Sequence, residues 1–387
     1  MINSLELFSG VGGLAMGLHQ AGFLPSALLD RDKDSCDNIL SNIACGFHDV
    51  KDWNVVMTDV RSVDYDSYKG IQFITGGPPC QPFSLGGKHK ANTDARDMFP
   101  EAVRAVREVR PLGFIFENVK GLLRKSFSTY FDYILLQLNY PEITAKTEND
   151  WLAHLRVLEQ HHTSRVRTGL EYNVVFRLVN AADYGVPQIR HRVVIVGFRT
   201  DLNVGWSFPE PTHSKESLLY SQFIDGTYWD EHKIAAKNRP EIAARFYSSS
   251  RQAGDAYCKT RWQTVRDALC GLPDPKSIAA ANHYNHEFKG GARQYAGHSG
   301  SILDEPSKTI KAGSHGVPGG ENMFADDSGA LRYYTVRESA RMQTFPDNYM
   351  FCGSWTESMR QIGNAVPVRL ARIVGESIAV QMKKVSI

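Results

Sequence analysis

The stretch SLELFSGVGGLAMGL, residues 4–18, decides the fold class. A short apolar run at residues 5–8 leads into a turn rich in glycine, and an apolar helical pattern follows at residues 14–21. Glycine has no Cβ, so such a turn can be tight and its backbone can approach a ligand closely. The order strand, glycine turn, helix predicts the first unit of a parallel α/β sheet with a ligand site at the turn.

The same alternation continues along the first half of the chain. Further short apolar runs, separated by helix-like segments such as residues 126–138, lie at residues 27–29, 71–75, 114–116 and 193–198. Strands that alternate with helices predict a doubly wound, Rossmann-like α/β domain. Each run is followed within three residues by Gly, Asp, Pro or Asn, and ligands of such sheets bind beyond the carboxyl ends of the strands.

Length and composition exclude several classes of protein. A chain of 387 residues exceeds the usual size of one compact core, so we expect a large and a smaller domain. No apolar run approaches the ~18 residues of a membrane span, and no secretory signal opens the chain, which predicts a cytoplasmic protein. Six cysteines without a Cys-x-x-Cys pair argue against a zinc site and a disulfide framework. Any special cysteine must therefore act alone.

The character of the sequence changes at about residue 200. Proline, glycine and histidine punctuate residues 200–331, which we interpret as a second domain, before a helical pattern near residues 370–382 rejoins the first. Residues 233–266 hold eight Lys or Arg against two acidic residues, with four interleaved aromatic residues. This composition fits a surface that follows a nucleic-acid backbone, or a solvated basic face.

The glycine turn alone admits several nucleoside cofactors. Gly10-x-Gly12-x-x-Ala15, with Asp30 twenty residues beyond Gly10, fits the dinucleotide fingerprint, so a nicotinamide or flavin enzyme remains an alternative. Asp30 can accept hydrogen bonds from ribose hydroxyls. Asp59 can bind an adenine amino group or cap a turn, and Phe8 can stack on adenine or fill the core.

A second glycine-rich stretch, GGPPCQPFS at residues 76–84, ends the run at residues 71–75. Paired glycines and prolines fix an unusual backbone path immediately before Cys80. An isolated cysteine is usually a buried structural residue, but this one follows a polar turn at the predicted ligand edge. The placement favours Cys80 as a nucleophile.

Six blocks in order carry a more specific signal. They are FSGVGG (8–13), the Cys80 stretch, ENV (117–119), QIRHR (188–192), TVRESARMQTFP (335–346) and QIGNAVP (361–367). Together they resemble the DNA (cytosine-5) methyltransferase family, in particular its bacterial restriction-modification type. The resemblance implies a catalytic and cofactor-binding domain at residues 1–199, completed by 360–387. It also implies a target-recognition domain at 200–335 and a hinge or support segment at 336–359.

The resemblance replaces the dinucleotide with S-adenosylmethionine, which leaves as S-adenosylhomocysteine. The residues that it assigns to this cofactor are Phe8, Ser9, Gly10, Gly12, Gly13, Asp30, Arg31, Asp59, Val60, Pro79, Asn364 and Val366. The family usually has glutamate where Asp30 falls, so Asp32 is an alternative ribose ligand. Residues 142–169, longer than the family pattern, predict a surface helical insertion.

For catalysis, the resemblance implies that the Cys80 thiolate adds to C6 of a flipped-out cytosine. Glu117 would grip N3 and the amino group of the base, and Arg192 its O2 oxygen. The DNA-binding residues would be Gln81, Ser84, Lys88, Lys90, Arg96 and Arg190, with no metal. The expected partners are duplex DNA and a cognate restriction endonuclease, with no membrane, and the enzyme would act as a monomer. An RNA methyltransferase and a non-catalytic DNA-binding protein are the rival functions.

Overall fold

The computed structural model describes residues 1–79, 97–145, 150–164, 169–240, 259–293, 300–313 and 322–385. The chain forms two compact units. Unit 1 consists of Met1–Val179, His191–Phe208 and Ala371–Ile387, and unit 2 of Asn180–Arg190 and Pro209–Leu370. Residues 200–208 thus lie in unit 1, and the segment expected as a hinge, 336–359, lies in unit 2. The catalytic and target-recognition roles of the two parts stay predictions.

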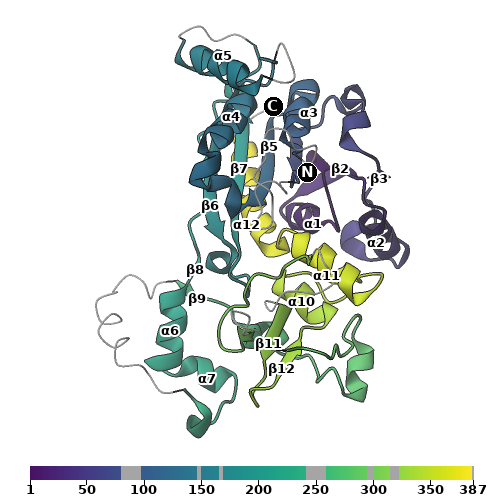
Figure 1. Cartoon of the computed structure of the whole chain (residues 1–387), viewed down its shortest axis with the longest axis vertical. Coiled ribbons are helices and arrows are strands. Elements are labelled where there is room, and N and C mark those ends of the chain that lie inside the picture. Colours follow the sequence, from purple (N-terminus) through teal and green to yellow (C-terminus); the bar gives the residue numbers. More distant parts are fainter. Residues whose placement is uncertain are drawn as a thin grey trace. The chain divides into compact units, whose positions relative to one another are not determined.

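A seven-stranded sheet with the order β3-β2-β1-β4-β5-β7-β6 forms the centre of unit 1 (Figure 1). Its strands are β1 (Ile2–Leu7), β2 (Phe23–Asp30), β3 (Val55–Met57), β4 (Phe73–Gly76), β5 (Gly113–Val119), β6 (Tyr172–Asn180) and β7 (His191–Arg199). The pairs among β1 to β5 are parallel, whereas β7 runs antiparallel to β5. The predicted strands and the doubly wound fold class are confirmed.

Helices cover both faces of this sheet. On one face, alternate strand residues such as Leu5, Leu7, Phe114 and Phe116 share an apolar core with residues of three helices, α3 (Phe99–Val109), α4 (Ser128–Asn139) and α5 (Trp151–Thr163). On the other face, the side chain of Glu6 contacts α1 (Gly13–Gln20). The remaining helix of the amino-terminal part, α2 (Lys33–Ala44), contacts β2 and β3.

The predicted insertion does contain a helix, α5, but it is not merely a surface element. Leu155 and Leu158 on its inner side are buried in the core of unit 1. Trp151 makes ring contacts with Tyr130 and Tyr133 of α4, at centroid distances of 5.5 and 5.4 Å. The insertion therefore extends the core beyond α4.

The helical pattern near the carboxyl end forms α12 (Val368–Met382), of which the residues from Ala371 on belong to unit 1. Gly375 permits its close approach to α1, since a Cβ there would lie 2.8 Å from both Ala21 Cβ and Leu18 Cδ2. Among the described residues, no helix is both long and apolar enough to cross a membrane.

Unit 2 is built from short elements. Its strands form a three-stranded sheet, β10 (Ser301–Ile302), β11 (Met323–Ala325) and β12 (Leu331–Tyr333), and the pair β8 (His213–Ser214) and β9 (Thr260–Arg261). Its helices are α6 (Lys215–Phe223), α7 (Thr227–Glu231), α9 (Val265–Leu269), α10 (Val336–Met342) and α11 (Trp355–Asn364). The motif at 335–346 supports this unit, because the buried Arg337 donates to the carbonyls of Tyr284, Pro346 and Tyr349.

Candidate active site

The glycine turn after β1 has the conformation that its sequence predicts. Gly10 and Gly12 have φ angles of 53° and 75°, in the left-handed region that favours glycine. A Cβ on Gly12 would also lie 2.7 Å from the Trp53 ring. Phe8 adopts a φ of 57° without being glycine, a conformation that side chains rarely take and that often marks functional sites.

Asp30, at the end of β2, is tied to the glycine turn. Its Oδ2 accepts a hydrogen bond from Gly10 N at 2.7 Å, and its Oδ1 accepts one from Asp32 N at 2.8 Å. Burial raises the pKa of Asp30, and these two backbone bonds oppose that shift. Asp32 instead caps α2 by accepting from Ser35 N at 2.9 Å. Asp30 is thus the carboxylate bonded to the glycine turn, whereas Asp32 caps α2.

Ser9 offers an observation that favours a polar ligand at this turn. Its side-chain oxygen is buried, and among the described residues it has no hydrogen-bond partner. A buried hydroxyl without a partner is costly unless a ligand or a water satisfies it. The predicted cofactor residues of unit 1 therefore fit a polar, nucleoside-containing molecule bound at the carboxyl edge of the sheet.

Asp59, after β3, is held by arginine. Arg61 contacts both carboxylate oxygens, with Nε 2.9 Å from Oδ1 and Nη2 2.5 Å from Oδ2, and Arg31 lies 4.0 Å away. The bond from Arg61 lowers the pKa of Asp59 to about 2, so the carboxylate is ionised near neutral pH. Asp59 also caps the turn at Val60–Ser62 through Arg61 N. Its carboxylate is an acceptor at the predicted adenine position.

The second glycine-rich stretch leaves β4 beside β5. Gly76 must be glycine, because a Cβ there would lie 2.4 Å from the Leu7 carbonyl oxygen of β1. Asn118 Nδ2 donates to the carbonyl of Pro78 at 3.1 Å, and a Cβ on Gly77 would lie 3.6 Å from Glu117 Oε2. The ENV motif thus anchors the chain two residues before Cys80, next to the Glu117 carboxylate.

Glu117 and Arg192 form a buried ion pair. Arg192 Nε lies 2.6 Å from Glu117 Oε1, and each side chain is only 11% exposed. The antiparallel register of β5 and β7, which sets Val119 opposite Arg192, places the two side chains on one face as diagonal neighbours. Burial lowers the pKa of Arg192, and the charge of Glu117 opposes this shift. The pair presents a carboxylate and guanidinium donors side by side, the combination that a pyrimidine ring edge requires.

Several predicted residues lie outside the described part of the chain. They are the nucleophile Cys80 and the proposed DNA contacts Gln81, Ser84, Lys88, Lys90 and Arg96. Pro79 is the last described residue before them. Their roles rest on the sequence motif and on the anchoring of Pro78 by Asn118.

The structure separates the residues of the QIRHR motif. His191 and Arg192 lie in β7, whereas Gln188 and Arg190 belong to unit 2 and are almost fully buried. Arg190 donates to the carbonyls of Ile310, Gly363 and Ala365 at 3.2, 2.8 and 3.0 Å. Arg190 is therefore too deeply buried to make the DNA contact predicted for it. It orders unit 2 instead, through these three bonds.

Asn364 and Val366, the last predicted cofactor residues, flank a backbone segment that the same hydrogen-bond network of unit 2 holds. Arg190 and Gln343 both bind the carbonyl of Ala365, and Gln343 also binds that of Ile362. These bonds fix the backbone on either side of Asn364. A Cβ on Gly363 would lie 2.4 Å from Ala312 N, so the residue before Asn364 must be glycine.

Sequence reasoning missed Glu6, a carboxyl group beneath the glycine turn. Glu6 is 2% exposed, and it accepts from Thr75 Oγ1 at 3.1 Å and from Ala15 N at 3.2 Å. It joins the helix after the glycine turn to the strand that leads towards Cys80. Its one available signal was an acidic residue inside an otherwise apolar strand.

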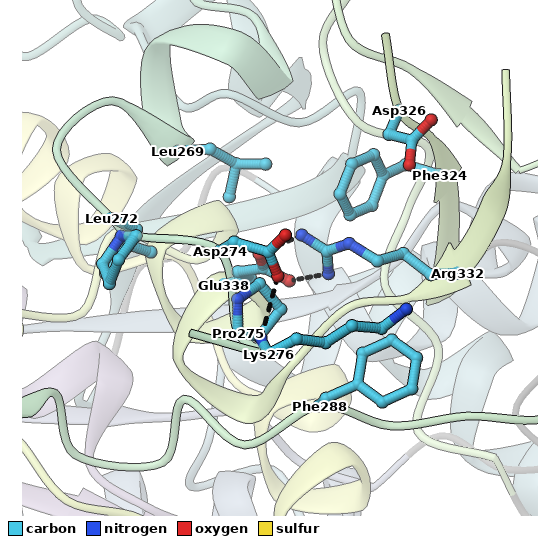
Figure 2. A pocket seen from close by; sticks show the side chains of 11 residues that line it. Leu269, Leu272, Asp274, Pro275, Lys276, Phe288, Phe324, Asp326, Arg332 and Glu338 are labelled. Atoms are coloured by element: carbon cyan, nitrogen blue, oxygen red, sulfur yellow. Dashed lines mark hydrogen bonds and ion pairs between the residues drawn. The ribbon is translucent and has the colours of Figure 1, made fainter. Parts of the chain in front are cut away.

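A cavity of about 250 Å³ lies within unit 2 (Figure 2). Arg332 forms a two-point ion pair with Glu338 and lies 4.2 Å from the Phe324 ring centroid, while Lys276 lies over Phe288. Arg332, Glu338 and Lys276 thus have partners within the wall. None of the residues predicted for catalysis or cofactor binding lines this cavity.

The fold and the site define an α/β enzyme of Rossmann-like type, with its ligand-binding groups at the carboxyl edge of the sheet. The family model of C-5 cytosine-specific DNA methylases matches residues 2–141 and 158–380. The Type II methyltransferase M.NgoMIV of Neisseria gonorrhoeae is 30% identical over 381 residues, which cover 98% of each chain. M.PspPI of Psychrobacter sp. is 31% identical over 97% of this chain and 78% of its own length.

Among solved structures, the S. pombe Dnmt2 methyltransferase aligns with a TM-score of 0.55 at 17% identity, over 100% of this chain and 99% of that one. This likeness confirms the methyltransferase fold. The chain belongs to the C-5 cytosine-specific DNA methylase family. It is a DNA cytosine-5 methyltransferase, and the family draws its methyl group from S-adenosylmethionine.

Proposed function

We propose that this enzyme methylates C5 of a flipped-out cytosine in a specific duplex DNA sequence, with Cys80, Glu117 and Arg192 as its catalytic residues. The observation that carries the proposal is the buried Glu117–Arg192 pair beside the anchored Gly77–Pro78 backbone. A carboxylate and a guanidinium so placed match N3, the amino group and O2 of cytosine. Gly77 and Pro78, the anchored residues beside this pair, precede Cys80 by three and two residues.

The chemistry explains the residue types. The thiolate of Cys80 adds to C6, and the electron pair of the C5–C6 double bond moves into the ring as N3 is held by Glu117. Arg192 stabilises charge on O2 during this addition. Carbon 5 then accepts the methyl group that S-adenosylmethionine supplies. Loss of the C5 proton and of the thiolate restores the aromatic ring and frees the enzyme.

For the cofactor, we assign Ser9, Gly10, Gly12 and Gly13 to its amino-acid end, Asp30 to the ribose, and Asp59, Val60 and Phe8 to the adenine. The orphaned Ser9 hydroxyl, the Asp30 bond to Gly10 and the ionised Asp59 support this assignment. Arg31, Pro79, Asn364 and Val366 complete the proposed set.

A covalent trap tests the nucleophile. A duplex that contains 5-fluorocytosine at the target should form a stable adduct with the wild-type enzyme and S-adenosylmethionine, because fluorine cannot leave as a proton does. Cys80→Ser should form none. Cys45→Ser is the matched control, since Cys45 is an exposed free thiol and its removal should leave trapping intact. Equal trapping by Cys80→Ser would remove the nucleophile assignment.

The nature of the polynucleotide is tested separately. Methyl transfer to duplex DNA and to transfer RNA should be compared at equal enzyme concentration, and we expect transfer to DNA alone. Transfer confined to RNA would overturn the assignment of duplex DNA. The large second unit, which holds most of residues 200–335, favours DNA as the partner whose sequence must be chosen.

We further propose that the enzyme modifies cytoplasmic host DNA against a cognate restriction endonuclease and acts as a monomer. The similarity to Type II methyltransferases over nearly the full chain supports this role. Mapping 5-methylcytosine in plasmid from cells that express the protein would give the recognition sequence and the modified base. Methylation scattered without a sequence motif would contradict a restriction partner.

A further inference from the structure

Arg104, on α3, contacts a turn that lies far from it in sequence. Its Nη2 donates to the carbonyl of Val60 at 2.7 Å, and its Nη1 donates to the carbonyl of Val63 at 3.2 Å. These two carbonyls stand at the beginning and just beyond the end of the 3-10 turn Val60–Ser62. One guanidinium therefore holds both ends of the turn.

The guanidinium is itself held in place. Glu101 and Glu108, one turn away on either side of α3, accept from Arg104 Nε at 2.8 Å and from Nη1 at 3.0 Å. The ring of Tyr65 lies under the guanidinium, 4.6 Å from its carbon. With its side chain only 21% exposed, Arg104 has little freedom to leave the two carbonyls.

The turn that Arg104 holds carries the proposed adenine ligands. Asp59 caps it, Ser62 N donates to the Asp59 carbonyl at 2.9 Å, and Val60 is its first residue. A turn with a single 3-10 repeat has few internal bonds, so contacts from outside decide how rigidly it is held. A rigid turn presents the Asp59 carboxylate and the Val60 backbone without an ordering cost at binding.

We propose that Arg104 is a positioning residue for cofactor binding: it fixes the Val60–Val63 backbone so that Asp59 and Val60 are preorganised for the adenine. Arg104 does not itself touch the cofactor. The inference rests on the proposed assignment of Asp59 and Val60 to adenine. A purely structural arginine would instead lower stability without a selective effect on the cofactor.

The test compares two arginines of the same helix. Arg104→Met removes the donors and keeps an apolar stem, and we expect the KM for S-adenosylmethionine to rise about tenfold with kcat changed less than about twofold. The KM for DNA should not change. Arg107→Met is the matched control, because Arg107 lies on α3 and pairs only loosely with Glu108, at 3.7 Å. It should keep the wild-type KM.

Two further variants separate the carbonyl bonds from the surrounding charges. Arg104→Lys keeps a charge and a donor but not the two-pronged geometry, so its KM for S-adenosylmethionine should fall between those of wild type and Arg104→Met. The double variant Glu101→Gln, Glu108→Gln removes the two negative charges but keeps side-chain oxygens that accept from Arg104, so its KM for S-adenosylmethionine should stay within about twofold of wild type. If Arg104→Met does not fold, Arg104→Lys carries the test through its raised KM.

The inference is overturned if Arg104→Met or Arg104→Lys leaves the KM for S-adenosylmethionine at the Arg107→Met value. It is also overturned if KM for both substrates and kcat change together with a lowered Tm. Calorimetric binding of S-adenosylhomocysteine to Asp59→Ala keeps the underlying assignment distinct. Undiminished binding there would remove Asp59 from the cofactor site, whatever Arg104 does.

Discussion

Glu117 and Arg192 are charges that burial would penalise if either stood alone. Replacing Glu117 by Gln keeps the shape but removes the charge that compensates Arg192. We expect methyl transfer to be lost, cofactor binding to persist, and the free energy of unfolding to fall by about 2 kcal/mol. Turnover, calorimetry with S-adenosylhomocysteine and urea unfolding measure the three effects.

The double variant Glu117→Gln, Arg192→Met provides the control for this prediction. It removes the uncompensated guanidinium and should recover part of the lost stability, but no activity. Loss of cofactor binding in Glu117→Gln would show that Glu117 serves the cofactor instead of the base.

Glu6 predicts a specific dependence of stability on pH. Burial, with a smaller contribution from Asp30, raises its pKa to about 8, against an ordinary 4.5 and despite bonds from Thr75 and Ala15. Between these two values the unfolded chain has released a proton that the folded chain keeps. The contribution of Glu6 to the free energy of unfolding therefore falls as pH rises, by up to about 1.4 kcal/mol per pH unit.

Glu6→Gln removes this titration and retains a side chain of the same size. Unfolding in urea at several pH values should give similar stabilities for the variant and the wild type near pH 5. The variant should be the more stable near pH 8, where the wild type carries the cost of the buried acid. Parallel curves for the two proteins over this range would refute the prediction.

At the scale of residues, the sequence predicted the site residues that combine a reactive or polar side chain with a position directly after an apolar run. Asp30, Asp59 and Glu117 end apolar runs, and the structure places each at the end of a strand or just after it. Glu6 and Arg104 could not be found this way, because their roles depend on contacts with Thr75 and with the Val60 carbonyl. Such pairings are set by the packed fold and not by local pattern.

Among the elements, α5 is an addition to the family pattern, and its contribution to the stability of unit 1 can be measured. The family match leaves out residues 142–157, which include the first half of this helix. His154 links it to the core: Tyr133 Oη lies 2.9 Å from its Nδ1, and its Nε2 lies 2.9 Å from the Ile143 carbonyl. Because the carbonyl can only accept, Nε2 carries the proton and the Tyr133 hydroxyl donates to Nδ1.

Trp151→Ala should lower the free energy of unfolding by about 2 kcal/mol, since the half-buried ring packs on Tyr130 and Tyr133. Leu152→Ala, at an exposed neighbouring position, should cost less than about 0.5 kcal/mol. Methyl transfer should survive both changes at low temperature, because α5 carries none of the proposed site residues. Equal costs in urea unfolding would mean that α5 does not stabilise unit 1.

The elements also have two features that sequence patterns do not predict: the direction of β7 and the boundary between the two units. The positions of β1, β2, β4, β5 and β7 followed from apolar runs, but the reversed direction of β7 did not, because an apolar strand has the same pattern in both directions. The five residues of the QIRHR motif are consecutive in sequence, and the sequence gives no sign of a boundary within them. In the structure the chain passes from unit 2 to unit 1 between Arg190 and His191, which gives Arg190 and Arg192 different surroundings.

For the whole molecule, one chain supplies every proposed catalytic and cofactor residue. We therefore expect full activity from a particle of 43.3 kDa, with a methylation rate proportional to enzyme concentration. Sedimentation at the assay concentration and a dilution series of initial rates check this. A mass of twice that value, with specific activity that falls on dilution, would show that a second copy is required.

The discontinuity of unit 1 has a consequence for biosynthesis. Its sheet is complete once β7 has been made, but Ala371–Ile387, which include Gly375 against α1, follow unit 2 along the chain. Until these residues are synthesised, the apolar surface of unit 1 that α12 contacts stays uncovered, and all of unit 2 is synthesised before unit 1 can close. A nascent chain that ends before Ala371 therefore has an incomplete unit 1, and we expect methyl transfer only after α12 has been synthesised.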